Sequence, residues 1–372
     1  MFSLSTISVS TLLALLPYVS AQAPAVVKDG LDPRLVLQGI NHGYLHNVSV
    51  SDVPLRSVCT FSNQWYSQCL PGSAPTTAVV TQPATTTTSG SAPTTTAASK
   101  ANYWFSFGDS YTQTGFTPSG TLPNSVNPFG NPDFPGWTAT GGTNWVGYVT
   151  TTYNNSLLYT YNYAYGGATI DANLVKPYTP TVLSLTDQVN QFLTTVANKP
   201  ASTPWTSSNA LFSIWIGIND IGNSWYLSGD RGAFSDTLLN AEFALVQKLY
   251  DAGARNFLFV NVPPIERSPL MLRESTESQA GERAVIAGFN SRLVAKANAF
   301  AAANSGVKTF FWDSHAQFTT ILNSPQTYGF KDATSYGSGS DIFWGNDYHP
   351  SSFAHKFFGQ EVGQNALEGT IW

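Results

Sequence analysis

The sequence predicts an α/β fold with a central, mostly parallel sheet over residues 101–372. Short apolar runs alternate there with longer segments of helical periodicity, and this alternation is typical of βα units. The chain has 372 residues, of which 42% are hydrophobic, so it is long and apolar enough to bury a sizeable core. In such a sheet, functional residues gather at the carboxyl ends of the strands.

Five strands are predicted from short runs that consist mainly of aromatic and aliphatic residues. The first run ends directly before Gly108-Asp109-Ser110, a tripeptide that suits a turn. The five runs are residues 103–107, 158–163, 211–216, 256–260 and 309–312.

Helical patterns lie between these strands. The segments of about 236–252 and 274–304 end close to Gly253 and Gly306, and glycine is favoured just past a helix C-terminus. Another helix is predicted from a single apolar stripe at positions i, i+4, i+7, i+8 and i+11. The stripe consists of Leu185, Val189, Phe192, Leu193 and Val196.

The segment before residue 101 differs in composition from the rest of the chain. Residues 1–21 are predicted to be a secretion signal, because the apolar run 11–16 precedes small-residue cleavage sites and is far shorter than the ~20 residues of a membrane span. Residues 71–100 are rich in Ser, Thr and Pro, which predicts a disordered, O-glycosylated linker. Asn47 and Asn154 begin N-glycosylation sequons, as expected of an extracellular glycoprotein.

The charge composition argues against binding to nucleic acid. Only 10% of the residues are charged, and the net charge of −5 comes without any block of Lys and Arg. No segment is long and apolar enough to predict a membrane anchor. Residues 101–372 contain no cysteine and no His/Asp cluster with zinc-site spacing, so neither a metal nor a nucleotide cofactor is expected.

Three motifs follow predicted strands in an order that suits acyl transfer. Ser110 follows the first strand, where its hydroxyl can face a cleft, although Gly-Asp-Ser is also ordinary turn composition. Gly167 follows the second strand and Asn219 the third. Their N–H groups, with the backbone N–H of Ser110, can donate to the oxyanion of a tetrahedral intermediate. Taken singly, the Gly-Gly pair at 166–167 and the segment 217–220 also suit simple turns.

His349 is the predicted general base. It precedes Pro350, a residue suited to the start of the last helix, and a serine nucleophile needs such a base within hydrogen-bond reach. Two other histidines lie in this region. His355 falls inside the predicted last helix, whereas His315 follows the fifth strand at the same sheet edge and is the more serious alternative.

Together these motifs resemble the GDSL (SGNH) hydrolases over about residues 101–372. That family has a Gly-Asp-Ser block, a Gly block, a Gly-x-Asn-Asp block and a late His block, matched in order by 108–110, Gly167, 217–220 and His349. The segments 215–223 and 261–265 look most like fungal acetylesterases of carbohydrate esterase family 16. The resemblance implies a three-layer α/β/α sandwich. It also implies that Ser110 is the nucleophile, that His349 is the base, and that the oxyanion hole consists of Ser110, Gly167 and Asn219.

One position departs from the family pattern. Many members have an Asp three residues before the His, where this chain has Asn346, whereas Asp347 stands only two residues before it. A carboxylate both orients the imidazole and stabilises its charged form. We therefore expect Asp347 to complete the catalytic set; a backbone carbonyl that orients the ring is the alternative.

A fragment of a second family precedes the linker. Residues 58–70 resemble the last third of a fungal family 1 cellulose-binding module, which implies cellulose as a partner. That family has four cysteines in two bridges, whereas this chain has only Cys59 and Cys69, so each is implied to pair with a partner that is missing. Residues 22–57 look unrelated to the module, and we attribute them to a gene-model error such as a retained intron. The residues that match the module's binding face are Asn63, Trp65, Tyr66 and Gln68.

The sequence thus predicts a secreted serine esterase. By its resemblance this esterase is an acetylesterase for small esters and for acetylated plant cell-wall saccharides such as xylo-oligosaccharides. One alternative is a broad-specificity lipase or acylhydrolase on the same scaffold. Another is a non-catalytic carbohydrate-binding protein, suggested by the aromatic content of 13%. Ester cleavage separates the last from the other two, and acyl-chain preference separates the first two.

Overall fold

The computed structural model describes residues 57–63, 66–71 and 101–372. In the last of these ranges, all five predicted strands are present, and every neighbouring pair is parallel. The strands are β3 (Asn102–Gly108), β4 (Leu158–Asn162), β5 (Ala210–Trp215), β6 (Asn256–Val260) and β7 (Lys308–Trp312).

The order of the strands reverses at the position of the predicted site. In the sheet the order is β4-β3-β5-β6-β7, so the chain moves to one side of β3 first and then to the other. Where the strand order reverses, the loops that leave the neighbouring strands diverge at the carboxyl edge. Ser110 follows β3 and Asn219 follows β5, which places both residues at this reversal.

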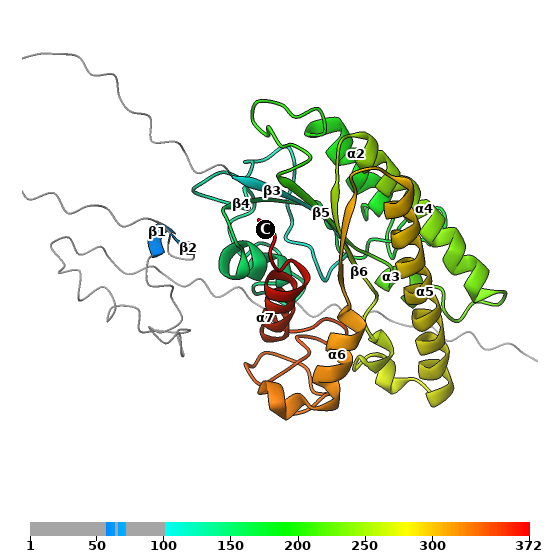
Figure 1. Cartoon of the computed structure of the whole chain (residues 1–372). Coiled ribbons are helices and arrows are strands. Elements are labelled where there is room, and N and C mark those ends of the chain that lie inside the picture. The colour runs from blue at the N-terminus through cyan, green and yellow to red at the C-terminus, as the bar shows by residue number, and fades with distance from the viewer. Residues whose placement is uncertain (1–56, 64–65, 72–100) are drawn as a thin grey trace, which may run out of the picture. The chain divides into compact units, whose positions relative to one another are not determined.

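Helices cover both faces of the sheet, which confirms the three-layer sandwich. In Figure 1, α2, α4 and α5 lie to the right of the sheet, where α4 packs against the other two, and α7 lies on the opposite side with α1 against it. The α-helices are α1 (Trp145–Tyr148), α2 (Leu185–Thr195), α3 (Ile218–Gly222), α4 (Arg231–Asp251), α5 (Thr276–Ala303), α6 (Ser314–Asn323) and α7 (Ser352–Glu361). Shorter helical turns are η2 (Val149–Tyr153), η3 (Ile265–Arg267), η4 (Met271–Arg273), η5 (Pro325–Tyr328) and η6 (Val362–Ala366).

Side-chain caps decide where the helices begin. Helix α4 starts earlier than the apolar pattern predicts, because Asp230 accepts a hydrogen bond from the Ala233 N–H at 3.0 Å. Helix α7, in contrast, starts later than predicted, after Ser351, whose Oγ accepts a hydrogen bond from the Ala354 N–H at 3.2 Å. The expectation that Pro350 opens the last helix is therefore wrong by two residues.

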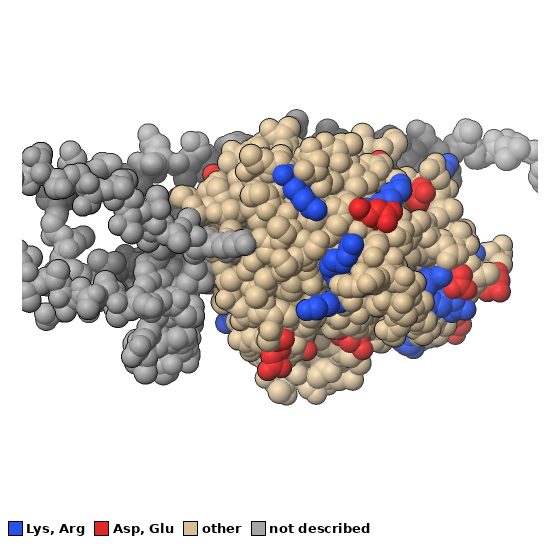
Figure 2. All heavy atoms as spheres, turned by 45° about the horizontal axis from the view of Figure 1, so that its top comes forward, with Lys and Arg blue, Asp and Glu red and all other residues tan. Residues whose placement is uncertain are grey.

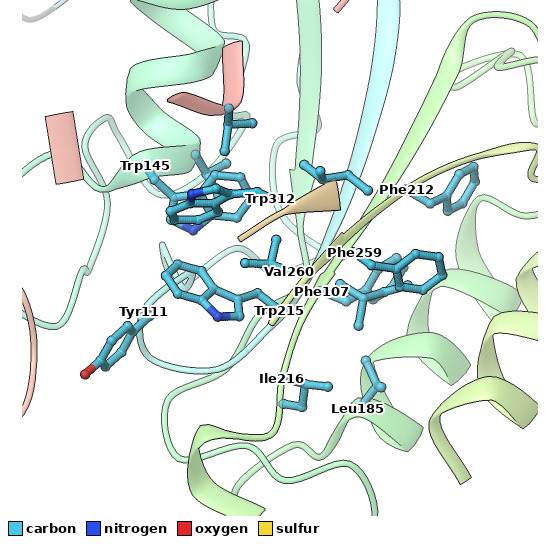
Figure 3. Close-up of a cluster of buried hydrophobic side chains, with 14 of the residues drawn as sticks. Phe107, Tyr111, Trp145, Leu185, Phe212, Trp215, Ile216, Phe259, Val260 and Trp312 are labelled. Atoms are coloured by element: carbon cyan, nitrogen blue, oxygen red, sulfur yellow. The ribbon is translucent and has the colours of Figure 1, made fainter. Parts of the chain in front are cut away.

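The two faces of the sheet bury different aromatic side chains. Successive strand residues point to opposite faces, so Phe105 of β3 packs on Phe192 of α2, while Trp104 packs on Trp145 of α1. On the tryptophan side, the ring centroids of Trp215 and Trp312 are 4.7 Å apart, and Trp145 lies within 6 Å of both. Figure 3 shows these indoles together, with the hydroxyl of Tyr111 pointing away from them at the edge of the cluster.

The remaining described residues form a hairpin, β1 (Ser57–Asn63) and β2 (Tyr66–Pro71), whose register places Cys59 opposite Cys69. The predicted secretion signal, nearly all of the segment 22–57, Trp65 and the linker lie outside the described residues. For Asn63, Tyr66 and Gln68 only the backbone is described. Their role in binding cellulose stays a prediction.

The surface carries few charges. On the face shown in Figure 2, Lys and Arg side chains lie singly or beside Asp and Glu, and most of the surface is uncharged. Among the residues that the structure describes, none of the helices is long and apolar enough to cross a bilayer. The same residues contain no group of three His, Cys, Asp or Glu side chains that could hold a metal ion.

Candidate active site

Ser110 and His349 meet at the carboxyl edge of the sheet. His349 Nε2 lies 2.7 Å from Ser110 Oγ, which is a hydrogen-bond distance, although 239 positions separate the two residues in the sequence. Ser110 stands in the turn that follows β3, and His349 comes from the loop before α7. A nucleophile and its general base require this contact.

The other two histidines of residues 101–372 have different partners. His355 lies in α7, where its Nδ1 accepts a hydrogen bond from the backbone N–H of Trp145 at 3.2 Å, and burial lowers its pKa to about 3. This bond joins α7 to α1. His315 lies in α6, and its backbone N–H donates to Asn261 Oδ1 at 3.0 Å. The contact with Ser110 therefore favours His349 over the alternative base His315.

Asn346 contacts the ring of His349 on the side away from Ser110. Its Oδ1 lies 3.0 Å from His349 Nδ1 and also accepts the backbone N–H groups of Tyr348 and His349, at 2.9 and 2.8 Å. Two backbone donors at the same atom fix the amide with its oxygen toward the ring. An acceptor there holds the imidazole proton on Nδ1, which leaves Nε2 free to accept the proton of Ser110.

Asp347 lies elsewhere than expected. Its carboxylate is paired with Arg273 at 2.6 Å, and its backbone carbonyl accepts the N–H of Leu270 at 2.7 Å. The reason is local: the side chain of Asn346 folds back onto N–H groups two and three residues further on, a turn typical of Asn, and the next side chain points outward. This corrects the expectation that Asp347 orients His349.

The protonation of His349 is set by its burial. Burial lowers the pKa of the imidazole from 6.5 to about 4, while the negative charge of Asp347 acts in the opposite direction and raises it. The ring is therefore neutral over the range in which most esters are stable, and it can act as a base throughout that range.

We expect the pH dependence of kcat/KM to report this shift. Activity should fall as the pH drops through about 4, because protonation of Nε2 removes the acceptor for the Ser110 proton, and it should be constant above about pH 5.5. Initial rates with a neutral ester, measured after brief exposure to each pH and compared with a sample returned to pH 7, separate titration from unfolding. An acid limb near 6.5 would contradict the buried, neutral imidazole.

The loops that carry the predicted oxyanion donors are bonded to one another. Asn219 Nδ2 donates one of its two hydrogens to the carbonyl of Ala168 at 2.9 Å, directly beside Gly167. The Tyr165 N–H, in the same loop, donates to the Gly108 carbonyl at 3.1 Å. Gly167 has a φ of +81°, a conformation that glycine adopts without strain. The side-chain bond of Asn219 and the backbone bond of Tyr165 thus join the segments that carry Gly167, Asn219 and Ser110.

Gln188 is a positioning residue that the sequence analysis missed. Its buried amide clamps Gly108: Oε1 accepts the Gly108 N–H at 3.0 Å, and Nε2 donates to the Gly108 carbonyl at 2.8 Å. Gly108 has no room for a side chain, since a Cβ there would lie 2.4 Å from the Trp215 carbonyl oxygen. The sequence does contain a signal for this role, since Gln188 is a polar residue on the otherwise apolar face of the helix between Leu185 and Phe192. A buried amide needs hydrogen-bond partners, so a glutamine at such a position indicates a specific contact.

Two buried carboxyl groups accept hydrogen bonds from backbone N–H groups of the loops around the site. Asp109 accepts the N–H of Tyr111 at 3.0 Å, and Asp220 accepts the N–H of Ile170 at 3.1 Å. Burial raises the pKa of Asp109 to about 8 and that of Asp220 to about 7. Asp109 directly precedes Ser110, and Asp220 directly follows Asn219, so each carboxyl group lies next to a predicted site residue. Asp109 thus accepts a hydrogen bond within its own turn, whereas Asp220 of α3 accepts one from the loop between β4 and α2 and ties the two segments together.

Comparison with known proteins identifies the class of protein to which this chain belongs. A GDSL-like Lipase/Acylhydrolase family profile matches residues 105–362. An acetylesterase of Thermothelomyces thermophilus is 45% identical over 272 residues, which cover 73% of this chain and 89% of that protein. An acetylesterase of Hypocrea jecorina is 24% identical over 333 residues, which cover 73% and 91%. Among solved structures, an acetylxylan esterase from Geobacillus stearothermophilus aligns over 70% of this chain and 91% of its own, with a TM-score of 0.40 and 15% identity.

The family profile and the 45% identical acetylesterase, added to a parallel α/β sheet with serine and histidine in contact at its carboxyl edge, define a carboxylic ester hydrolase. Within that class, the chain belongs to the family of GDSL-like lipases and acylhydrolases. The family predicted from the order of the four sequence blocks is thereby confirmed.

Proposed function

We propose that this esterase removes acetyl groups from plant cell-wall saccharides such as xylo-oligosaccharides, as a member of carbohydrate esterase family 16. The observation that carries the proposal is the 2.7 Å contact between Ser110 and a neutral His349, in a chain 45% identical to an acetylesterase. The more distant acetylesterase relative supports the same acyl group. The resemblance of residues 215–223 and 261–265 to fungal acetylesterases supports a carbohydrate substrate.

In the proposed mechanism, Ser110 Oγ attacks the ester carbonyl while His349 Nε2 takes the hydroxyl proton. The oxyanion accepts hydrogen bonds from the backbone N–H groups of Ser110 and Gly167 and from the second amide hydrogen of Asn219. His349 then gives this proton to the ester oxygen of the sugar as the bond to the acyl carbon breaks, so the sugar leaves with a free hydroxyl group. A water molecule that gives a proton to His349 attacks the acyl-enzyme, and His349 returns that proton to Ser110 Oγ as acetate is released. Asn346 keeps the imidazole in the required tautomer at each step.

We further propose that the protein is exported, with residues 1–21 as its signal, and that residues 58–70 descend from a cellulose-binding module. The apolar run, the cleavage sites and the Ser/Thr/Pro-rich linker support export. An extracellular location would bring the enzyme to acetylated cell-wall fragments outside the cell.

Acyl-chain preference and acetate release test the proposed function. We expect p-nitrophenyl acetate to be cleaved with a kcat/KM at least about tenfold above that of the octanoate, a difference in transition-state binding that an acyl pocket of limited size can supply. Acetate release should also be detected from acetylated xylo-oligosaccharides, measured side by side with polymeric xylan. A preference for octanoate would favour a broad-specificity lipase. Absence of any ester cleavage would leave a carbohydrate-binding protein.

A further inference from the structure

A hollow of about 390 Å³ lies beside the proposed oxyanion hole. One wall comes from the loop between β4 and α2, including Lys176 and Tyr178, and the other comes from the connection between α3 and α4, including Asn223, Tyr226 and Leu227. The volume falls in the range of about 300–1,000 Å³ that small-molecule sites occupy. An acetyl group would fill only a small part of it.

Tyr178 connects this hollow to the proposed oxyanion hole. A Cβ at Gly167 would lie 2.3 Å from Tyr178 Cε1, so the tyrosine ring rests directly against the glycine backbone. Helix α3 provides a second connection, because Asn223 follows Asn219 by one turn and donates its backbone N–H to the Asn219 carbonyl at 3.0 Å. The same loop and the same helix therefore border both the proposed oxyanion donors and the hollow.

The lining combines aromatic faces with hydrogen-bond donors. Tyr178 and Tyr226 are 77% and 63% exposed, so their rings are available to a ligand without rearrangement of the core. Lys176 and Asn223 add an ammonium and an amide, and the Asn223 Nδ2 reaches the Lys176 carbonyl at 3.4 Å, which joins the two walls. Sugar rings present C–H faces that stack on aromatic rings and hydroxyl groups that accept from such donors.

We propose that this hollow binds a sugar residue adjacent to the acetylated one, with Tyr178 and Tyr226 as stacking platforms. The inference rests on the proposed function, because it assigns the hollow to the alcohol side of the ester. Its consequence is a preference for acetylated oligosaccharides over small acetate esters with no second ring.

The test compares kcat/KM for monoacetylated xylotriose with kcat/KM for methyl acetate in the full chain. In Tyr226→Ala we expect the ratio of the two values to fall about five- to tenfold through a higher KM for the sugar, since one stacked ring is lost. Tyr226→Phe keeps the ring and should keep the ratio. Tyr336→Ala removes another tyrosine, 52% exposed and outside the lining of the hollow, and serves as the matched control. Titration of each variant with unacetylated xylotriose measures sugar binding without any ester chemistry.

Three results would overturn the inference in distinguishable ways. An unchanged ratio in Tyr226→Ala, with normal cleavage of both esters by the unmodified enzyme, would show that the hollow does not bind sugar. If Tyr226→Ala changed only the ratio of kcat/KM for p-nitrophenyl octanoate to kcat/KM for p-nitrophenyl acetate, the hollow would bind the acyl chain and not a sugar. Cleavage of methyl acetate without any cleavage of the acetylated sugar by the unmodified enzyme would contradict the proposed function itself, and this inference with it.

Discussion

Replacement of Ser110 by alanine is expected to reduce kcat for p-nitrophenyl acetate by about 10³- to 10⁶-fold, the loss seen when a nucleophile is removed from a serine–histidine pair. The hydroxyl contacts His349 Nε2 at 2.7 Å, and without it no acyl-enzyme can form. The side chain is only half-buried and fills no part of the core, so the melting temperature should stay within a degree or two of the unmodified protein.

The matched control is Ser119→Ala, which removes an exposed serine hydroxyl bonded only to Thr117. Both variants should be measured after identical purification, with the melting temperature as the test of folding. Retention of more than about a tenth of the activity in Ser110→Ala would contradict the nucleophile assignment, because loss of the nucleophile costs orders of magnitude.

Replacement of Asn346 by leucine should produce the second largest loss, about 10²- to 10⁴-fold in kcat. Leucine has a similar size but no acceptor, so His349 Nδ1 loses its partner at 3.0 Å and the imidazole can adopt the wrong tautomer. The backbone N–H groups of Tyr348 and His349 also lose their acceptor. The measurement is kcat at pH 7, with circular dichroism to verify the fold.

Two further variants isolate the role of the side chain behind the imidazole. Asn346→Asp keeps the acceptor and adds a negative charge, which should raise the pKa of His349 and move the acid limb of the pH profile to higher pH while activity is retained. Asp347→Asn removes the exposed pair with Arg273 and the negative charge that raises the pKa of His349, and it should cost less than about tenfold at pH 7, where the imidazole is neutral with or without that charge. A larger loss in Asp347→Asn than in Asn346→Leu would reinstate Asp347 as the orienting group.

The strands could be predicted because each is marked by a short apolar run in the sequence. Ser110 and His349 could be predicted because parallel strands end at one edge of the sheet and few residues there can act as nucleophile or base. The aromatic run before Gly108 is buried along its whole length, so composition alone identifies β3. Parallel strands end at one edge, which brings Ser110 and Asn219 to the same side of the sheet. Among the three histidines of residues 101–372, the sequence favours His349 because it precedes Pro350 on a predicted loop at the sheet edge, where Ser110 needs a base. The family resemblance implies the same residue.

The residue that orients His349 and the residue that binds Gly108 could not be predicted from the sequence. Both depend on the path of loops through space, which the spacing of residues along the chain does not determine. A carboxylate stabilises a charged imidazole better than an amide does, so the sequence favoured Asp347 although it stands one residue from the usual position. The turn made by Asn346 in the structure shows that the Asp347 side chain points outward, toward Arg273. Gln188 looked like one polar residue in an amphipathic helix, because its function requires knowledge that α2 packs beside the end of β3.

The indole cluster has a use outside the chemistry of the site. Trp215 packs on Tyr111, whose ring lies 5.3 Å from that of His349 and whose hydroxyl donates to the carbonyl of Tyr348. The contacts of the histidine loop therefore continue through one phenol ring to indoles packed within 6 Å of each other. We expect a ligand that displaces the histidine loop to change the intrinsic fluorescence and the near-ultraviolet circular dichroism of this indole cluster. A titration followed by either signal, without any attached dye, checks this expectation.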